Sequence, residues 1–166
     1  MITVTDDHVL PGSLDRVFEC FWDVERWPVI TPHVKRIEMR SRTPDHQEFS
    51  MTVESGGALH AVESVRDAIT NRRITYRQTR PPAFLREHTG EWIFEPVAGG
   101  TRVTLIHRAV LDLPGAPALL GVASALEAAE KVARALKENG SRTIHAVREF
   151  LESNRQASGP NAGQKQ

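Results

Sequence analysis

The sequence has 166 residues, of which 40% are hydrophobic and 25% charged, an ordinary balance for one folded domain with a sizeable core. Lys plus Arg and Asp plus Glu number 21 each, which argues against nucleic acid or an acidic membrane as a partner. A single cysteine, Cys20, excludes an intramolecular disulfide and favours a reducing compartment.

The start of the sequence has neither the basic region nor the apolar stretch of a signal peptide. No apolar run approaches the roughly 20 residues that span a bilayer. We therefore expect a cytoplasmic protein without a membrane span. Residues 156–166 lack apolar periodicity and are expected to form a disordered tail, whereas residues 1–155 are expected to form a single domain.

The N-terminal part predicts one strand and two short helices. Ile2–Leu10 alternates weakly, as a strand does, and ends at Pro11-Gly12. Ser13 is expected to cap a helix. The apolar residues at helical spacing that follow it are Leu14, Val17, Phe18, Phe21 and Trp22. A second short helix is expected over residues 24–30, ended by Thr31-Pro32.

From residue 33 to residue 113 the pattern changes to an alternation of period two, broken by turn signals. Strands are expected at 34–42, 47–54, 58–68, 73–79, 85–96 and 101–111. The breaks include Gly56-Gly57 and Gly99-Gly100. Such short turns join antiparallel strands, because parallel strands need long crossover connections.

A long amphipathic helix is expected over residues 126–153. Gly140 lies inside it and costs about 1 kcal/mol relative to Ala, which indicates a kink or a close approach of a ligand. The order of elements predicts an α+β helix-grip fold. In this fold a curved seven-stranded antiparallel sheet wraps around the long C-terminal helix and, with two short helices, encloses a cavity.

Alternation along the strands separates inward from outward side chains. In the strand at 101–111, the apolar face is expected to point to the long helix and carries His107 with it. In the strand at 58–68, the face without the carboxylates carries Ser64 and Arg66 inward. The other inward side chains include Met51, Tyr76, Gln78, His88, Trp92 and Phe94.

This interior contains too many polar groups for a dry core. Burying an unpaired polar group costs roughly 1–3 kcal/mol. A wet cavity that receives a partly polar ligand resolves the conflict.

Several short strings, in order along the chain, resemble one known family. They are Val24-Glu-Arg-Trp-Pro28, Glu63-Ser-Val-Arg-Asp67, Arg73-Ile-Thr-Tyr-Arg-Gln78, Gly90-Glu-Trp92, Gly99-Gly-Thr-Arg-Val103 and Leu105-Ile-His107. Their order and spacing, up to about residue 155, resemble the aromatase/cyclase branch of the START-like superfamily. These bacterial enzymes fold and aromatise poly-β-ketone chains.

The resemblance implies that Trp27, Arg66, Trp92 and His107 surround the substrate, with His33 where a cavity-mouth tyrosine occurs in relatives. Some relatives carry an Asp on the long helix that works with the strand His. Thr143 stands at that position here and does not orient an imidazole electrostatically. The resemblance further implies a hydrophobic polyketide substrate, an acyl carrier protein as partner, no cofactor, and a monomer or weak homodimer.

We interpret the chain as a cofactor-independent polyketide aromatase/cyclase. Aldol cyclisation removes a proton from a methylene between two carbonyls, and aromatisation removes water, so a base, an enolate stabiliser and shaped walls are needed. The candidate catalytic residues are Arg66, His107 and Thr143, with His107 as base because an unperturbed imidazole has a pKa of about 6.5. The candidate substrate-binding residues are Trp27, His33, Met51, Ser64, Tyr76, Trp92 and Phe94.

Other functions remain open on the same fold. A non-catalytic binder of a lipid, quinone or polyketide needs only an apolar lining. A co-chaperone-like protein needs an exposed partner surface and no convergence of Arg66 with His107. The segment 113–124 is a candidate lid or carrier contact. His60, His88 and His107 lack a tight ligand motif, so no metal is expected.

Overall fold

The structure, a computed structural model, describes residues 1–157. Its strands are β1 (Ile2–Leu10), β2 (Val34–Thr43), β3 (His46–Ser55), β4 (Ala58–Ile69), β5 (Arg73–Arg80), β6 (Leu85–Val97) and β7 (Gly100–Leu111). Its helices are α1 (Leu14–Trp22), a 3₁₀ turn (Val24–Arg26), α2 (Trp27–Ile30), α3 (Ala116–Leu120) and α4 (Ala125–Ala157).

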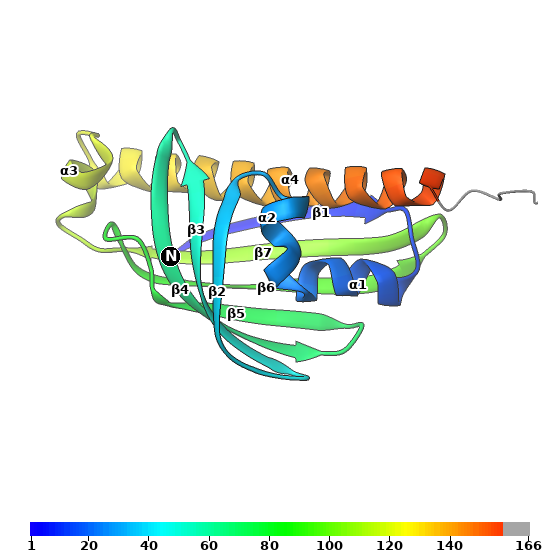
Figure 1. Cartoon of the computed structure of the whole chain (residues 1–166). Coiled ribbons are helices and arrows are strands. Elements are labelled where there is room, and N and C mark those ends of the chain that lie inside the picture. Colours follow the sequence, from blue (N-terminus) through cyan, green and yellow to red (C-terminus); the bar gives the residue numbers. More distant parts are fainter. Residues whose placement is uncertain (158–166) are drawn as a thin grey trace, which may run out of the picture.

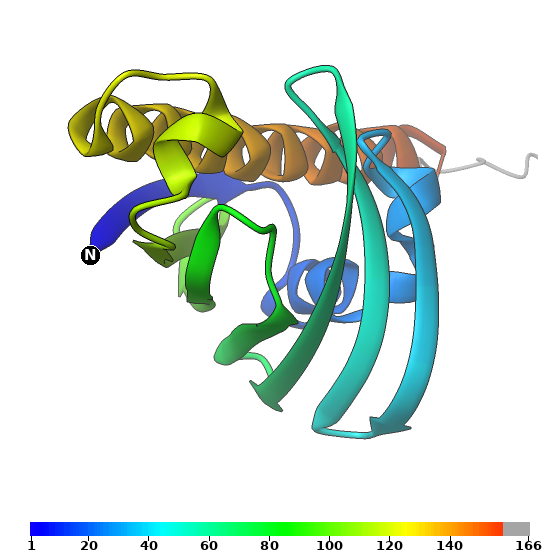
Figure 2. The same cartoon turned by 90° about the vertical axis from the view of Figure 1, so that its left-hand side faces the viewer.

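The strands form one antiparallel sheet in the order β1-β7-β6-β5-β4-β3-β2. The sheet curls strongly, and α4 lies along β1 across its open side (Figures 1 and 2). From β2 to β7, short turns join consecutive strands, so each strand pairs with the next one in the sequence. The predicted helix-grip fold is confirmed.

Three local features differ from the sequence-based expectations. Ser13 has the extended backbone of an N-cap but makes no side-chain cap hydrogen bond, and Asp15 supplies negative charge to the first turn instead. The segment 113–124 contains helix α3, which has a proline in its first turn and ends at Gly121 with a φ of 68°. Residues 156 and 157 continue α4, and the rest of the predicted tail lies outside the described residues.

One end of the concave face is filled by an aromatic core. The ring of Phe21, on α1, lies 4.7 Å from that of Trp92 and 5.5 Å from that of Phe94. A second, smaller cluster packs the other end of the face against α4, and its buried members are Leu85, Ala109, Val132 and Leu136. Between these two clusters, a space remains open over the concave face of the sheet. Among residues 1–157, no helix is both long and apolar enough to cross a membrane.

Helix α4 approaches β7 closely at Gly140. A Cβ atom at this position would lie 2.6 Å from Cδ2 of Leu105 and 3.3 Å from Nε2 of His107. From the sequence, Gly140 indicated a kink or the close approach of a ligand. In the structure it is strand β7 that lies close to this glycine. The absence of a side chain lets the helix pack directly on Leu105 and His107 of the strand.

We expect Gly140→Val to destabilise the protein. Its side chain meets Leu105 and His107, and overpacking of this kind costs about 1–3 kcal/mol, more than the few tenths gained in helix propensity. Urea unfolding of the two proteins measures the difference. Glu138→Val, at an exposed position of α4, is the control and should change stability by less than about 0.5 kcal/mol. Equal free energies of unfolding for Gly140→Val and the wild type would contradict the close packing.

Candidate functional site

A polar row crosses the concave face from β3 to β7. Gln47 pairs with Arg66, Arg66 with Tyr76, Tyr76 with Gly90, and Gly90 with His107. Directly paired residues of antiparallel strands point to the same face of a sheet, so these side chains are neighbours on the interior side. The sequence placed Arg66 and His107 inward separately, and the register now joins them in one row.

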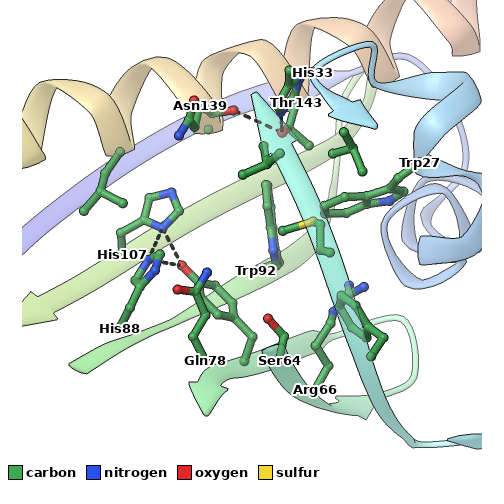
Figure 3. A pocket seen from close by; sticks show the side chains of 17 residues that line it. Trp27, His33, Ser64, Arg66, Gln78, His88, Trp92, His107, Asn139 and Thr143 are labelled. Atoms are coloured by element: carbon green, nitrogen blue, oxygen red, sulfur yellow. Dashed lines mark hydrogen bonds between the residues drawn. The ribbon is translucent and has the colours of Figure 1, made fainter. Parts of the chain in front are cut away.

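A cavity of about 130 Å³ lies over this row, beneath α4. Figure 3 shows its polar side chains: Gln78, His88 and His107 gather on one side, His33 and Thr143 on the other, and Ser64 with Arg66 farthest from the helix. The predicted site residues that line it are Trp27, His33, Met51, Ser64, Arg66, Tyr76, Trp92, His107 and Thr143.

Phe94 is the predicted site residue that does not line the cavity. Its side chain points inward as expected, but α1 covers that end of β6, and the Phe94 ring packs against Phe18 at 5.2 Å and Phe21 at 5.5 Å. Alternation along a strand predicts the face of a residue and does not predict what covers that face. Phe94 therefore belongs to the aromatic core.

Other cavity residues were left out of the predicted site. His88 and Gln78 were placed inward by alternation but were not among the candidate site residues, and both line the cavity, where His88 is buried. Asn139 and Gly140 lie on α4 next to Thr143 and also line it. Leu136, Gly140 and Thr143 are spaced by four and three residues, which places them on one face of a helix. This spacing in the sequence could have predicted that this face of α4 lines the cavity.

Tyr76, His88 and His107 form a hydrogen-bonded cluster. The Tyr76 hydroxyl contacts Nδ1 of His107 closely and lies 3.3 Å from Nε2 of His88. The two histidine nitrogens lie 3.3 Å apart. Nε2 of His107 is buried and has no hydrogen-bond partner within residues 1–157. The cluster therefore leaves one ring nitrogen of His107 for a ligand.

Burial keeps this cluster neutral. It lowers the pKa of His88 to about 4 and, with His88 adding to the effect, that of His107 to about 3. Burial also raises the pKa of Tyr76 above its usual value. His107 thus differs from the unperturbed imidazole assumed from the sequence: at neutral pH it is uncharged and is a weak base.

Arg66 is fixed at the edge of the cavity by aromatic rings and a carbonyl. Its guanidinium carbon lies 5.3 Å from the ring centroid of Trp22 and 5.4 Å from that of Trp27. Nη2 donates to the backbone oxygen of Phe21, and Nη1 donates to Oε1 of Gln47 at 3.4 Å. Burial lowers the pKa of Arg66 to about 9, so it stays cationic at neutral pH. These bonds use two of the five N–H donors of a guanidinium.

Thr143 pairs with His33 rather than with His107. The Thr143 hydroxyl lies 3.0 Å from the Asn139 carbonyl, to which it donates, and 3.1 Å from Nε2 of His33. Since the hydroxyl has one proton, Nε2 of His33 donates to it. Burial lowers the pKa of His33 to about 4. Thr143 and His33 therefore form a second neutral pair on the other side of the cavity.

The three histidines weighed together in the sequence do not converge. His60 lies edge-on to Phe84 with ring centroids 6.4 Å apart, whereas His88 and His107 face each other. Within the part of the chain that the structure describes, no group of three or more His, Cys, Asp or Glu side chains is placed to hold a metal ion.

Comparisons with known proteins agree with this architecture. The model of the family described as "Polyketide cyclase / dehydrase and lipid transport" matches residues 1–146. The chain is 30% identical over 151 residues to the granaticin polyketide synthase bifunctional cyclase/dehydratase of Streptomyces violaceoruber, covering 89% of the chain and 47% of that protein.

Two solved structures of aromatase/cyclases (ARO/CYC) have the same fold. The di-domain ARO/CYC StfQ of the steffimycin biosynthetic pathway matches with a TM-score of 0.85 and 28% identity, over 93% of this chain and 52% of StfQ. The Zhui aromatase/cyclase from Streptomyces sp. R1128 matches with a TM-score of 0.84 and 24% identity, over 95% and 97% of the two chains. The chain thus spans about half the length of StfQ and of the granaticin enzyme.

We expect the free energy of unfolding to fall as the pH decreases from about 6.5 toward about 4. His33, His88 and His107 stay neutral in the folded protein, whereas in the unfolded chain each takes up a proton near pH 6.5. The unfolded state then binds more protons, and each histidine contributes a slope of up to about 1.4 kcal/mol per pH unit. Urea unfolding at about pH 7.5 and about pH 5 measures the effect.

Two variants separate these histidines from exposed ones. His107→Gln should reduce the slope. His145→Gln, at an exposed position of α4, is the control for the substitution itself. The pKa of His46 is raised by its hydrogen bonds to Asp67 and Glu48, so His46 stabilises the folded state more as the pH falls. Its contribution therefore opposes that of the three buried histidines and diminishes the slope. Equal wild-type stability at the two pH values would refute neutral burial of the three histidines.

Proposed function

The chain belongs to the polyketide cyclase/dehydrase and lipid transport family, and from this membership we propose that it is a cofactor-independent polyketide aromatase/cyclase. In this proposal the cavity holds a poly-β-ketone chain, directs its aldol cyclisation and promotes the loss of water that aromatises the ring. The names of the granaticin relative and of StfQ support it.

One observation carries the proposal beyond family membership. Two buried polar atoms in the cavity, Nε2 of His107 and Oε1 of Gln78, have no hydrogen-bond partner among the described residues. Leaving buried polar atoms unpaired is costly, so native proteins rarely retain them without a reason. A ligand that carries carbonyl and hydroxyl groups satisfies both atoms. A purely apolar lipid satisfies neither, which disfavours the binding-protein alternative in its lipid form.

The remaining predicted residues take roles that follow from their positions. Arg66 is the cation that stabilises enolate charge at the edge of the cavity, because it keeps its charge and has free donors. Thr143 and His33 form a neutral polar part of the wall on the other side of the cavity. Trp27, Met51 and Trp92, with Ser64 and Tyr76, shape the walls that select one ring register.

Proton removal falls largely to a solvent base, hydroxide or buffer, in this proposal. A methylene between two carbonyls becomes acidic enough for such a base once its carbonyls accept hydrogen bonds. Nδ1 of His107 is already engaged by the Tyr76 hydroxyl, and with a pKa of about 3 His107 is a much weaker base than a free imidazole. We therefore assign His107 a hydrogen-bonding role in catalysis in place of the general-base role expected from the sequence.

An acyl carrier protein is the proposed donor of the substrate. Around α3, the large apolar side chains of Leu113, Leu119 and Leu126 are exposed by 55%, 60% and 70%. Of the two roles open for residues 113–124, lid or carrier contact, we propose the carrier contact, extended to Leu126 at the start of α4. A monomer or weak homodimer and a cytoplasmic location remain predictions.

The test is the product profile of a minimal polyketide synthase supplied with the protein. We expect the wild type to redirect shunt products to one defined aromatic product. His107→Ala and Arg66→Ala should lower the yield of that product by about 10²-fold, the size of effect seen when one transition-state donor is removed. The measurement is chromatography of the products over several chain lengths.

Matched controls are His145→Ala and Arg72→Ala, which remove exposed residues of the same types and should keep the wild-type profile. Thermal unfolding must show that the Arg66 variant is folded, because the Phe21 carbonyl and three aromatic rings lose their partner. A wild-type protein that leaves the profile unchanged at every chain length would exclude the cyclase role for these substrates and favour a binding protein.

A further inference from the structure

We propose that Tyr76 and His88 are positioning residues that hold His107 in the tautomer protonated on Nε2, so that His107 donates a hydrogen bond to a ligand carbonyl. The identity of that carbonyl rests on the proposed polyketide function. The tautomer rests only on the hydrogen-bonded cluster and is testable without any substrate.

The first argument is the count of protons in the cluster. At neutral pH each imidazole has one N–H and one lone pair, and the Tyr76 hydroxyl has one proton. Either Nδ1 of His107 accepts a hydrogen bond, from Tyr76 or from His88, or Nδ1 is protonated and donates to one of them. The two arrangements place the proton of His107 on different nitrogens.

The strengths of the donors and acceptors, together with which contact is closer, favour one of these arrangements. A phenol hydroxyl is a strong donor, a phenol oxygen is a weak acceptor, and an imidazole lone pair is a strong acceptor. The strong O–H···N bond therefore belongs to the shorter contact, which Tyr76 makes with His107, and the weaker N–H···O bond belongs to the 3.3 Å contact with His88. In this order His88 donates to Tyr76, Tyr76 donates to Nδ1 of His107, and the proton of His107 is on Nε2.

Two glycines make the arrangement possible. Gly90 lies between Tyr76 and His107 in the polar row, and a Cβ atom there would lie 2.5 Å from the Tyr76 hydroxyl oxygen. The tyrosine reaches His107 only because this position has no side chain. Gly140 lies against Nε2 of His107 from α4, and its missing side chain leaves no group of this position between that nitrogen and the cavity.

The helix supplies no competing partner for the His107 ring. Some members of the resembled family carry an Asp at the position of Thr143. Here the Thr143 hydroxyl is hydrogen-bonded to His33 and to the Asn139 carbonyl. The orientation of His107 therefore comes from the sheet, from β5 and β6, and not from α4. Figure 3 shows His88 beside His107 and Thr143 on the far side of the cavity.

A neutral imidazole N–H aimed at a carbonyl suits the proposed chemistry. It stabilises negative charge that develops on the carbonyl oxygen as the adjacent methylene loses its proton to a solvent base. It does so without being charged itself, in a site where burial makes a charged imidazole costly. In this role His107 is the catalytic residue, and Tyr76 and His88 act through it.

The test is the tautomer of His107, measured by ¹⁵N NMR of the histidine rings in the full-length protein near pH 7. Long-range correlations between each ring nitrogen and the protons bound to ring carbons distinguish protonated from unprotonated nitrogens. We expect His107 in the wild type to be neutral and protonated on Nε2. Tyr76→Phe, which keeps the ring and removes the hydroxyl, should give a mixture of tautomers. A wild-type His107 that is protonated on Nδ1 or on both nitrogens, or a Tyr76→Phe spectrum identical to the wild type, would overturn the proposal.

Variants at His88 give a second measurement that does not depend on Tyr76→Phe. His88→Gln keeps an N–H donor toward the Tyr76 hydroxyl and should preserve the Nε2 tautomer, whereas His88→Leu should lose it. His145, exposed on α4, is the internal reference and should be the same in all proteins. Equal spectra for His88→Gln and His88→Leu would exclude the role of His88.

Product profiles then connect the tautomer to the chemistry. Tyr76→Phe should lower the yield of the directed product by about tenfold, less than the loss of His107 itself. Full yield from Tyr76→Phe, together with a disturbed tautomer, would overturn the donor role of His107. If the wild type has the Nε2 tautomer but directs no product, the proposed function fails and the positioning of His107 stands.

Discussion

The burial of a polar row with a single cation, Arg66, in a curled sheet is the feature on which the rest of the structure depends. Curling brings the interior faces of β3 to β7 over one space, and α1 fills one end of that space with aromatic rings. α4 closes the other side and can do so only because Gly140 has no side chain. The cavity is the part of the concave face that neither helix fills, and the register of the strands places the polar row at its floor.

Burial also determines the chemistry of this row. Taking His88 and His107 out of water lowers their pKa values and leaves them as hydrogen-bonding groups in place of a titrating acid–base pair. Arg66 keeps its charge because cation–π contacts and a backbone carbonyl replace its water. A site with one fixed cation and neutral donors suits the stabilisation of enolate charge better than proton abstraction by a side chain.

The sequence predicted the fold almost completely, because alternation, short turns and one long amphipathic helix all agree. It also placed Arg66 and His107 on the interior face, since the apolar partners of each strand identify that face. It could not predict that α1 covers Phe94, that Thr143 is engaged by His33, or that burial lowers the pKa of His107. These facts depend on which elements pack over a face, and a strand pattern contains no information about the element that covers it.

The most direct test of this account is a crystal structure of the protein with a stable, non-reactive 1,3-diketone mimic of the substrate. The account predicts the mimic in the cavity over the polar row, with a carbonyl oxygen within hydrogen-bond distance of Nε2 of His107 and a second oxygen near Arg66. A mimic bound outside the cavity, or bound inside it with its oxygens turned away from His107, would contradict the account.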